Sequence, residues 1–324
     1  MTLSQFPQFK RLSRKDRPAI ESFTSCYEPY SDFSFTSLWS WDVSGEVEWC
    51  VLNHNLVVKL PSYGNPITSR FSVLGTTDIS ATIQTLLTTE VVGGHLQLVP
   101  QLVIDNIGRD HRFVVQEDVD DADYVIDIES FLGRAGHIYA NTRKKLNSFS
   151  RRIPSVIELD LRDRDSLNFV HVIFEEWLAS HDSSDEAMAR KFDVEATAIT
   201  RALGLGDGVR CIGIRLNRKP YAFQIFDHID RDWCIFHFAK AAGSFHGCSE
   251  YLMDAVFASC RASGAKYCNE EPDLGVSGLR IAKRQHHPSR FLRKYSIRLD
   301  IGSTEVGARA TPLRRTLSGS AFSA

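Results

Sequence analysis

The alternation of hydrophobic and polar residues predicts helices and strands along most of the chain. Apolar residues spaced three or four apart indicate a helix, and apolar residues at every second position indicate a strand. In the first half, this spacing predicts helices over 14–27 and 78–91, the start of a helix within 30–42, strands on either side of Asn53–Asn55, mixed signals over 95–108 and a strand over 121–133. In the second half, it predicts helices over 139–152, 165–181, 192–206 and 247–264, and strands over 155–163, 209–216, 219–229, 232–241 and 266–271.

The order of the later elements resembles that of a Gcn5-related acyltransferase (GNAT) domain. Two helices, three antiparallel strands, a helix and a final strand follow one another from 165 to 271, and the first half shows a looser version of this order. We therefore expect an α+β protein of two tandem GNAT-like domains, each a mixed, mostly antiparallel sheet flanked by helices. The expected N-terminal domain covers 1–135, the C-terminal domain with the active site covers 136–302, and 303–324 is expected to be a disordered tail.

Length and composition agree with a folded protein from a reducing compartment. A chain of 324 residues, 43% hydrophobic and 24% charged, is long enough for two domains with hydrophobic cores. Its seven cysteines are scattered and form no C-x-x-C pair, which argues against a disulfide framework and a zinc site. The first residues lack the apolar core of a signal peptide, and no run approaches the roughly 18 apolar residues of a membrane span. We expect a cytoplasmic protein.

Two basic segments lie within a chain whose net charge is only −2. The first covers 134–152 and the second covers 280–294, and neither contains an acidic residue. Separate basic segments can form a positive surface in a nearly neutral protein. The second segment is a candidate to bind a tRNA acceptor arm or an anionic headgroup, with a solvated helix face as the alternative. For the helix at 141–152 in the first segment, a solvated face is the default and binding of nucleic acid is the alternative.

Several motifs resemble the C-terminal domain of bacterial phosphatidylglycerol lysyltransferases and its soluble stand-alone relatives. They are SDFSFTSLWSWD (31–42), NTRKKLNSF (141–149), HFAKA (237–241), YLMDAVF (251–257) and NEEPDLGVSGLRIAKRQHHPSRFLRKY (269–295). The last is the most specific, because it is long and is not a matter of composition. The likeness spans roughly residues 25 to 300. For the membrane-bound relatives it implies transfer of an aminoacyl group from charged tRNA to a lipid hydroxyl, and those relatives carry a large transmembrane region that is not seen in this sequence.

Three residues of the last motif are the candidate catalytic groups. A carboxylate at a strand end can orient or deprotonate an attacking hydroxyl or amine, and a guanidinium can stabilise a developing oxyanion or hold a phosphate. Pro272 and Gly275 are expected to turn the chain so that the carboxylates face the basic residues that follow. With the family pattern added, we assign catalytic roles to Glu271, Asp273 and Arg280. The alternative is that the carboxylates cap a helix N-terminus while the basic residues lie in solvent.

The basic residues of the same motif are candidates to bind the phosphates of a donor. On a helix, Arg280, Lys283 and Arg284 lie at i, i+3 and i+4 and share one face. Phosphate contacts need only Lys and Arg side chains in an open arrangement. We therefore assign Lys283, Arg284 and Arg290 to donor binding, with a solvated helix face as the alternative.

A GNAT domain keeps its pyrophosphate loop where this chain has AKAAGSFHG (239–247). Backbone N–H groups of such a strand-to-helix turn can cradle phosphates, which makes Lys240, Gly243 and Gly247 candidates for donor binding. The usual Q/R-x-x-G-x-G/A pattern is absent, and this departure weakens coenzyme A as the donor. His237 lies among apolar strand residues and is expected to be a core histidine rather than a general base.

These residues predict an aminoacyltransferase-like enzyme. It would move an aminoacyl group from an activated donor, expected to be aminoacyl-tRNA, to an unidentified hydroxyl or amine acceptor, for which phosphatidylglycerol is one candidate. Two alternatives stay open: a coenzyme-A-dependent N-acyltransferase, and a non-catalytic protein that binds RNA or anionic lipid on a GNAT fold. No cofactor is expected, with aminoacyl-tRNA as the co-substrate and a coenzyme A thioester as the alternative. No metal is expected, because the adjacent His286 and His287 point in different directions and precede a proline.

Overall fold

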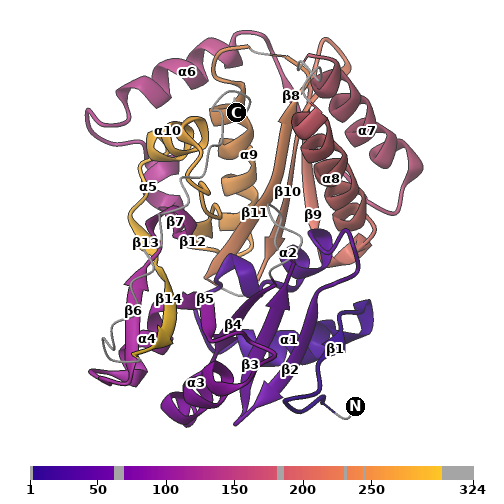
Figure 1. The fold of residues 1–324 in the computed structure, drawn as a ribbon. Coiled ribbons are helices and arrows are strands. Elements are labelled where there is room, and N and C mark those ends of the chain that lie inside the picture. Colours follow the sequence, from indigo (N-terminus) through magenta and orange to yellow (C-terminus); the bar gives the residue numbers. More distant parts are fainter. Residues whose placement is uncertain (1–2, 62–68, 181–185, 230–231, 244, 301–324) are drawn as a thin grey trace.

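The computed structural model describes residues 3–61, 69–180, 186–229, 232–243 and 245–300 of the chain. A small sheet with its helices forms an N-terminal part, and a seven-stranded sheet organises a larger C-terminal part. In Figure 1 the first part lies below and the second above, with helices on both faces of the large sheet. The predicted α+β class, with mostly antiparallel sheets flanked by helices, is confirmed. The predicted tail, 303–324, lies outside the described residues.

The N-terminal part contains a four-stranded antiparallel sheet in the order β1-β2-β3-β4. Its strands are β1 (Lys10–Arg11), β2 (Glu48–Leu52), β3 (Asn55–Leu60) and β4 (Arg70–Leu74), and its helices are α1 (Arg17–Thr24), α2 (Phe35–Ser40), α3 (Ile79–Thr88) and α4 (Gln101–Ile107). Asn53 and His54 join β2 to β3 with positive φ angles, as two-residue hairpin turns often require. Apolar residues of the sheet, α3 and α4 form one core.

The large sheet has the strand order β13-β7-β12-β11-β10-β9-β8. Its strands are β7 (Asp123–Asp127), β8 (Ser155–Glu158), β9 (Arg210–Leu216), β10 (Lys219–His228), β11 (Trp233–Ala241), β12 (Tyr267–Asn269) and β13 (Arg290–Leu292). One face is covered by α5 (Ile128–Gly133), α6 (Ala140–Ser150) and α9 (Cys248–Ala262), and the other by α7 (Arg164–Ala179) and α8 (Glu186–Leu203). From α7 to β12 the elements follow the predicted GNAT order, and α10 (Ser277–Gln285) comes next.

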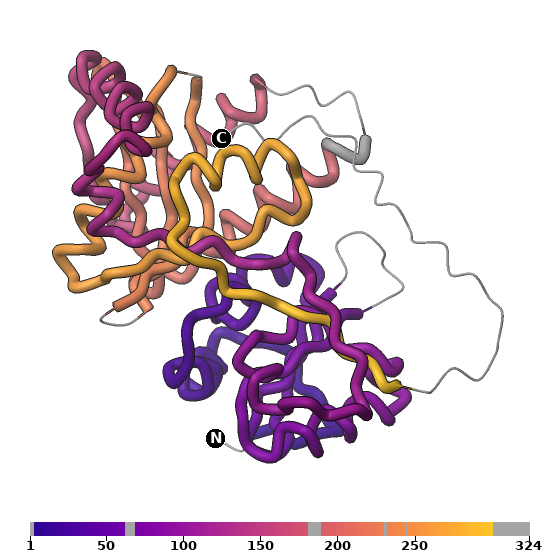
Figure 2. Tube along the Cα trace, turned by 90° about the vertical axis from the view of Figure 1, so that its left-hand side faces the viewer, coloured from indigo at the N-terminus to yellow at the C-terminus, as the bar shows by residue number. Residues whose placement is uncertain are grey.

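Two strands cross between the halves of the chain. β7 comes from the N-terminal half but pairs with β12 and β13 in the large sheet. β14 (Lys294–Leu299) comes from the C-terminal half but lies between β5 (His95–Pro100) and β6 (Phe113–Glu117) in a separate three-stranded sheet. Figure 2 shows this yellow segment running from the upper body to the lower one. The sheets therefore do not divide at residue 135, and the division into two tandem domains stays a prediction.

β11 separates from its neighbour β12 after a short paired stretch. The two strands are parallel, and on β11 the pairing covers only Trp233 to Ile235. β11 nevertheless continues to Ala241 and stays paired with β10 on its other side. Beyond Ile235, the edge of β11 that faces away from β10 has no strand partner among the described residues. β11 therefore has an edge that is unpaired among the described residues, called the open edge below, beside the chain that follows β12.

A β-bulge lies at the start of this open edge. Ile225 and Phe226, consecutive on β10, face Phe238 and Phe236 on β11, so His237 is the extra residue. The bulge reverses the alternation of the strand: Phe236 packs in the core beneath α9, whereas Phe238 packs in the core beneath α7 and α8. Bulges change the direction of side chains and are over-represented beside active sites. His237 is therefore a candidate member of a functional site at this edge.

The predicted and observed elements differ in two respects. The predicted strand over 121–133 is in fact β7 followed directly by α5, and the side chain of Asp127 caps this helix by accepting a hydrogen bond of 2.7 Å from the Ser130 N–H. The hydrophobic spacing also gave no indication of β1, β4, β6, β13 or β14. Of these, β6, β13 and β14 pair with strands that are distant in the sequence, whereas β4 pairs with the preceding strand β3.

Candidate functional site

A buried cluster of ionisable side chains surrounds His237 at the open edge of β11. His237 Nδ1 lies 3.0 Å from Glu271 Oε1, and His237 Nε2 lies 3.2 Å from Asp227 Oδ2 on β10. The His237 side chain is only 1% exposed. Burial alone lowers the pKa of His237, but the two carboxylates outweigh it and raise the pKa to about 9. His237 is therefore an imidazolium at neutral pH and donates a hydrogen bond to Glu271 instead of acting as a general base.

Glu271 follows β12 and is held by contacts from both parts of the molecule. Its N–H donates to Asn269 Oδ1 at 2.6 Å, and the hydroxyl of Ser37, on α2, donates to Glu271 Oε1 at 3.2 Å. Its φ of 60° lies in the left-handed region, a strained conformation for a non-glycine residue that persists only where the surroundings impose it. The side chain is 17% exposed. Glu271 is thus a fixed carboxylate within reach of a small acceptor.

Asp273 and Arg280 form an ion pair that closes the turn after β12. Arg280 donates to both Asp273 oxygens, at 2.8 and 2.7 Å, and to Asp120 at 2.6 Å. The Tyr124 hydroxyl and the Gly275 N–H also donate to Asp273, at 2.6 and 2.8 Å. Burial alone would raise the pKa of Asp273, but the hydrogen bonds from Arg280 and Tyr124 hold it below its ordinary value. The carboxylate is 2% exposed and has both oxygens occupied, so the geometry favours a bracing role over contact with an acceptor.

Lys283 extends from α10 to the main chain of the same turn. Its ammonium donates to the carbonyl oxygens of Glu271 and Pro272, at 3.0 and 2.9 Å, and to that of Glu270. Burial lowers the pKa of Lys283. His286 Nδ1 lies 3.0 Å from the Glu270 carboxylate, so α10 holds the loop at two points. With three carbonyl partners, the Lys283 ammonium fixes the loop, and its role in donor binding stays a prediction.

Lys240 points away from the open edge. Its ammonium lies 2.8 Å from Glu195 on α8 and 4.3 Å from the ring centroid of Trp177 on α7. The bulge at His237 explains this direction, because it turns the even-numbered residues beyond it toward α7 and α8. The pairing with Glu195 gives Lys240 a structural partner, and the structure does not bring it together with Glu271.

Arg284 and Arg290 also occupy separate positions. Arg290 stacks over Trp233 and Tyr267 and pairs with Glu28 at 2.5 Å. These contacts attach β13 to the junction of the two parts. Arg284 is exposed on α10 and is the freer of the two. Neither residue joins the His237 cluster, so their roles in donor binding stay predictions.

Close contacts with neighbouring groups require glycine at two positions of the turn between β11 and α9. Gly247 has a φ of 89°, and a Cβ there would lie 2.1 Å from the Lys145 carbonyl oxygen on α6. The main chain of α6 therefore rests directly on this turn. A Cβ on Gly243 would meet the Tyr221 hydroxyl at 3.0 Å, and that hydroxyl accepts a hydrogen bond of 3.1 Å from the Phe245 N–H. Close packing explains both glycines without a phosphate, and their donor-binding role stays a prediction.

We expect Gly247→Ala to lower the free energy of unfolding by about 2 kcal/mol, since it adds a strained φ and a contact that α6 must move to relieve. Gly45→Ala is the matched control, because Gly45 has a φ of 71° but nothing within 4 Å of its Cβ position. In the control, the free energy of unfolding should fall only by the cost of placing alanine at a positive φ angle, about 1 kcal/mol. Equal losses in urea denaturation would show that α6 does not press on the turn.

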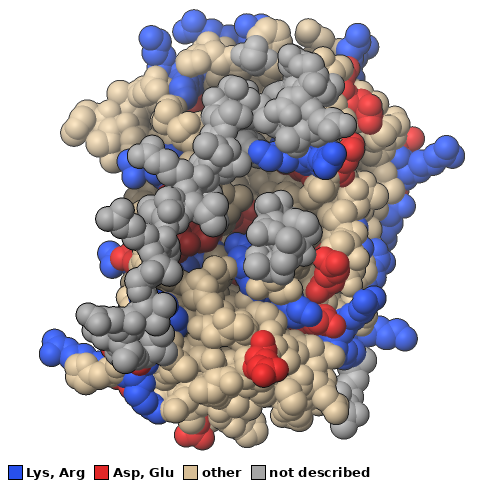
Figure 3. All heavy atoms as spheres, viewed as in Figure 1, with Lys and Arg blue, Asp and Glu red and all other residues tan. Residues whose placement is uncertain are grey.

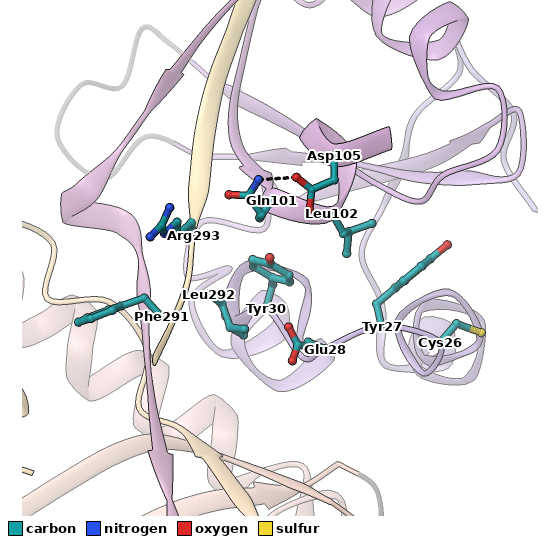
Figure 4. Close-up of a pocket in the computed structure, with 10 residues that line it drawn as sticks. All are labelled: Cys26, Tyr27, Glu28, Tyr30, Gln101, Leu102, Asp105, Phe291, Leu292 and Arg293. Carbon is teal, nitrogen blue, oxygen red and sulfur yellow. Dashed lines mark hydrogen bonds between the residues drawn. The ribbon is translucent and has the colours of Figure 1, made fainter. Parts of the chain in front are cut away.

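A separate open pocket of about 590 Å³ lies beside the connection from β13 to β14 (Figure 4). Its lining residues are Cys26, Tyr27, Glu28, Tyr30, Gln101, Leu102, Asp105, Phe291, Leu292 and Arg293. The polar groups in it partner one another or nearby residues: Gln101 donates to Asp105 at 2.7 Å, and Glu28 pairs with Arg290. None of the predicted site residues lines this pocket, so the cluster at the edge of β11 remains the candidate site.

Possible metal ligands, cysteines and apolar helices can also be assessed in the described part of the chain. There, no group of three or more His, Cys, Asp or Glu side chains is arranged to hold a metal ion. All seven cysteines are free, and all except Cys26 are buried; burial raises the pKa of the Cys268 thiol to about 12, which argues against a thiolate nucleophile. Among the described helices, none is both long and apolar enough to cross a bilayer.

Sequence reasoning found Glu271 but missed two members of its cluster, Asp227 and Ser37. The sequence contains one weak signal: Asp227 and His237 are ionisable residues that directly follow apolar residues within predicted strands. Nothing in the sequence linked Ser37 to them, because it lies 200 residues before His237.

Known structures share this architecture. A conserved protein of unknown function from Bacteroides thetaiotaomicron is 21% identical, with a TM-score of 0.74, over 90% of this chain and 99% of that one. The C-terminal domain of a putative lysylphosphatidylglycerol synthetase from Agrobacterium fabrum is 10% identical, with a TM-score of 0.60, over 88% and 91%. L-PGS from Bacillus licheniformis is 12% identical, with a TM-score of 0.61, over 94% and 96%. At these identities the likeness shows the fold.

The sequence itself shows the family. No curated protein matches the chain, but the family model described as phosphatidylglycerol lysyltransferase, C-terminal, matches residues 25–298. This range contains every motif on which the predicted resemblance depended, and the resemblance is confirmed. The chain belongs to the phosphatidylglycerol lysyltransferase C-terminal family, which indicates an acyltransferase-type enzyme.

Proposed function

We propose that this protein transfers an aminoacyl group from an activated ester, aminoacyl-tRNA, to a hydroxyl or amine acceptor at the open edge of β11. The observation that carries the proposal is the fixed Glu271 carboxylate. It is partly exposed, lies beside a strand edge that has no partner among the described residues, and is hydrogen-bonded to a charged His237 and to Ser37. Membership of the family supports the class of reaction.

In the proposed reaction, Glu271 accepts a proton from the acceptor as the acceptor oxygen or nitrogen attacks the ester carbonyl carbon. A new acyl bond forms to the acceptor, and the bond from the carbonyl carbon to the tRNA ribose oxygen breaks. The proton held by Glu271 then passes to the departing ribose oxygen, which restores the carboxylate. Main-chain N–H groups on the unpaired edge of β11 can stabilise the oxyanion that develops on the carbonyl oxygen.

The other predicted catalytic residues support Glu271 in this scheme. The ion pair of Asp273 with Arg280 closes the turn, and Lys283 holds the Glu271 carbonyl. Both contacts restrain the residue in its left-handed conformation. Ser37 adds a contact from the N-terminal part, so the site needs both parts of the chain.

The test is a label-transfer assay with the full-length protein. Total tRNA charged with radiolabelled amino acids is mixed with extracts of lipids and small molecules, and loss of label from tRNA is followed over time. We expect Glu271→Gln to slow the transfer about 100-fold, as the removal of a general base typically does. Glu90→Gln, at an exposed position of the N-terminal part, is the control and should transfer at the wild-type rate.

Two results would contradict the proposal. If label stays on tRNA in every extract, aminoacyl-tRNA is not the donor, and coenzyme A thioesters become the next donors to test. If label leaves tRNA at the same rate with Glu271→Gln, the reaction does not depend on this carboxylate and the site lies elsewhere.

A further inference from the structure

Basic side chains gather at one end of the C-terminal part, around the C-terminal end of α6. Lys144 lies on α6, Arg151 and Arg152 follow it, and Arg218 and Lys219 lie at the turn between β9 and β10. All five are exposed. Figure 3 shows Lys and Arg side chains along the upper edge of the molecule, where α6 runs in Figure 1. We call these five residues, with the apolar residues among them, the basic rim.

Strand pairing and ring contacts connect the elements of the rim. Four residues separate the end of α6 from β8, which pairs with β9 so that Ser155 faces Arg215, and the chain that follows α6 therefore leads to the end of the sheet that carries the β9–β10 turn. The guanidinium of Arg152 lies 3.8 Å from the ring centroid of Phe245, in the β11–α9 turn. Phe245 in turn stacks on Tyr221 of β10, with ring centroids 5.4 Å apart. The helix, the hairpin and the turn therefore meet at this end of the sheet.

The charges of the rim have no acidic partners in the described structure. Most other basic side chains around the candidate site are paired: Lys145 with Glu250, Lys240 with Glu195, and Arg280 with Asp273. By contrast, none of the five basic side chains of the rim forms an ion pair with a described residue. A group of unpaired like charges costs electrostatic energy in the free protein, and an anionic partner would relieve it.

Apolar side chains stand exposed among these charges. Ile153, three residues after the end of α6, is 87% exposed, and Val156 and Phe245 are 44% and 41% exposed. At the other end of α6, Ile138 is 51% exposed. Solvated basic faces do not need aliphatic residues at their tips. The combination of unpaired Lys and Arg with protruding aliphatic side chains is the pattern of a surface that lies in the headgroup region of an anionic bilayer.

This pattern fits a bilayer better than RNA. Recognition of RNA relies on stacking of bases on aromatic rings or guanidinium planes and on hydrogen bonds to base edges. The rim has one exposed aromatic ring, Phe245, and its contacts are already taken by Tyr221 and Arg152. Ile153 and Val156 offer nothing to a base but can insert among acyl chains. The positive charge of the rim would attract either RNA or an anionic bilayer. The exposed aliphatic residues favour the bilayer.

We propose that the basic rim binds the surface of a bilayer containing anionic phospholipid. Lys144, Arg151, Arg152, Arg218 and Lys219 contact the headgroups, while Ile153 and Val156 enter the interface. Because the β11–α9 turn is part of the rim, this contact places the open end of β11 beside the lipid surface. The binding itself does not rest on the proposed transfer reaction, although it would bring a lipid acceptor close to Glu271.

The test is co-sedimentation of the full-length protein with vesicles. Wild-type protein should sediment with vesicles of phosphatidylcholine and phosphatidylglycerol in equal parts, should stay in solution with phosphatidylcholine alone, and should be released by high salt. The triple variant Ile153→Ser, Arg218→Gln, Lys219→Gln should bind at least tenfold more weakly, since each basic residue near the surface contributes appreciably. A thermal unfolding curve close to that of the wild type shows that the variant is folded.

The control is a triple variant with the same chemistry outside the rim: Val91→Ser, Lys15→Gln and Arg109→Gln, all at exposed positions of the N-terminal part. It should bind vesicles like the wild type. The proposal is overturned if the wild-type protein ignores anionic vesicles, or if both triple variants lose binding equally. It is also overturned if the rim variant loses affinity for uncharged tRNA but keeps its affinity for vesicles. None of these outcomes depends on turnover, so they are distinct from failure of the transfer assay.

Discussion

Replacing Lys294 with alanine is expected to lower the free energy of unfolding by about 3–5 kcal/mol, because it leaves buried carboxylates without their cation. The Lys294 side chain is fully buried, and its ammonium lies 2.7 Å from Asp123 Oδ1. It also contacts the carboxylate of Asp32 and lies 3.1 Å from the Ser31 hydroxyl. Burial alone favours the neutral amine, but Asp123 and Asp32 raise the pKa of Lys294 above its ordinary value.

This ion cluster lies where β7 and β14 cross between the two halves of the chain. Lys294 begins β14, Asp123 begins β7, and Asp32 comes from the segment before α2. Asn269, at the end of β12, donates to Asp123 at 2.9 Å and to the Pro29 carbonyl at 2.7 Å. Removal of Lys294 therefore leaves charge uncompensated at the junction of three sheet segments. The loss should affect the cooperative unfolding of the whole molecule and not one exposed loop.

Urea denaturation measures this loss, with Lys266→Ala as the control. Lys266 also forms an ion pair, 2.8 Å from Asp232, but the two side chains are 66% and 48% exposed. Exposed pairs contribute about 1 kcal/mol or less. A loss for Lys294→Ala as small as that for Lys266→Ala would mean that water or rearranged side chains solvate Asp123 and Asp32, and that the junction is looser than the structure indicates.

The elements that could be predicted are those fixed by nearby residues. The hydrophobic spacing located α7, α8, α9 and the three strands β9 to β11, because each buries one face over a continuous stretch. The pairing of Asp273 with Arg280 was also within reach, since seven residues and a turn separate them. The pairing of the short strands at the junction could not be predicted in the same way. The spacing indicated a strand at β7 but not its partners β12 and β13, and it gave no indication of β14, which takes its place between β5 and β6.

The candidate site could be predicted only in part, because the face of a strand on which a side chain lies depends on features that the hydrophobic pattern does not show. A single inserted residue in a strand moves the following side chains to the opposite face, and the bulge at His237 does this without any mark in the hydrophobic pattern. Lys240 was expected beside the phosphate turn, but after the bulge it points to Glu195 on α8. Gly247 was attributed to phosphate binding, yet the neighbour that explains it is the main chain of α6, about 100 residues earlier. Local sequence indicates which residues are candidates for the site but not the face of the sheet on which their side chains lie.

The His237 cluster leads to a second large effect, which depends on pH. The folded protein raises the pKa of His237 to about 9 from an ordinary value of 6.5. A raised pKa stabilises the folded state fully below the unfolded pKa, and this contribution is lost as the pH rises through the folded pKa. The shift corresponds to about 3 kcal/mol. The free energy of unfolding of the wild-type protein should therefore fall by about that amount between about pH 6 and pH 10, relative to His237→Gln, which does not titrate there.

Denaturation of both proteins across this pH range isolates the effect of His237 with its two carboxylates, because titrating groups remote from the cluster contribute equally to each protein and cancel in the difference. His171→Gln is the control for the loss of an imidazole as such, since His171 is exposed on α7 and lies 4.0 Å from Glu175. A wild-type curve parallel to that of His237→Gln would mean that His237 is neutral between the two carboxylates. Glu271 would then lack the charged hydrogen-bond donor on which the proposed site depends.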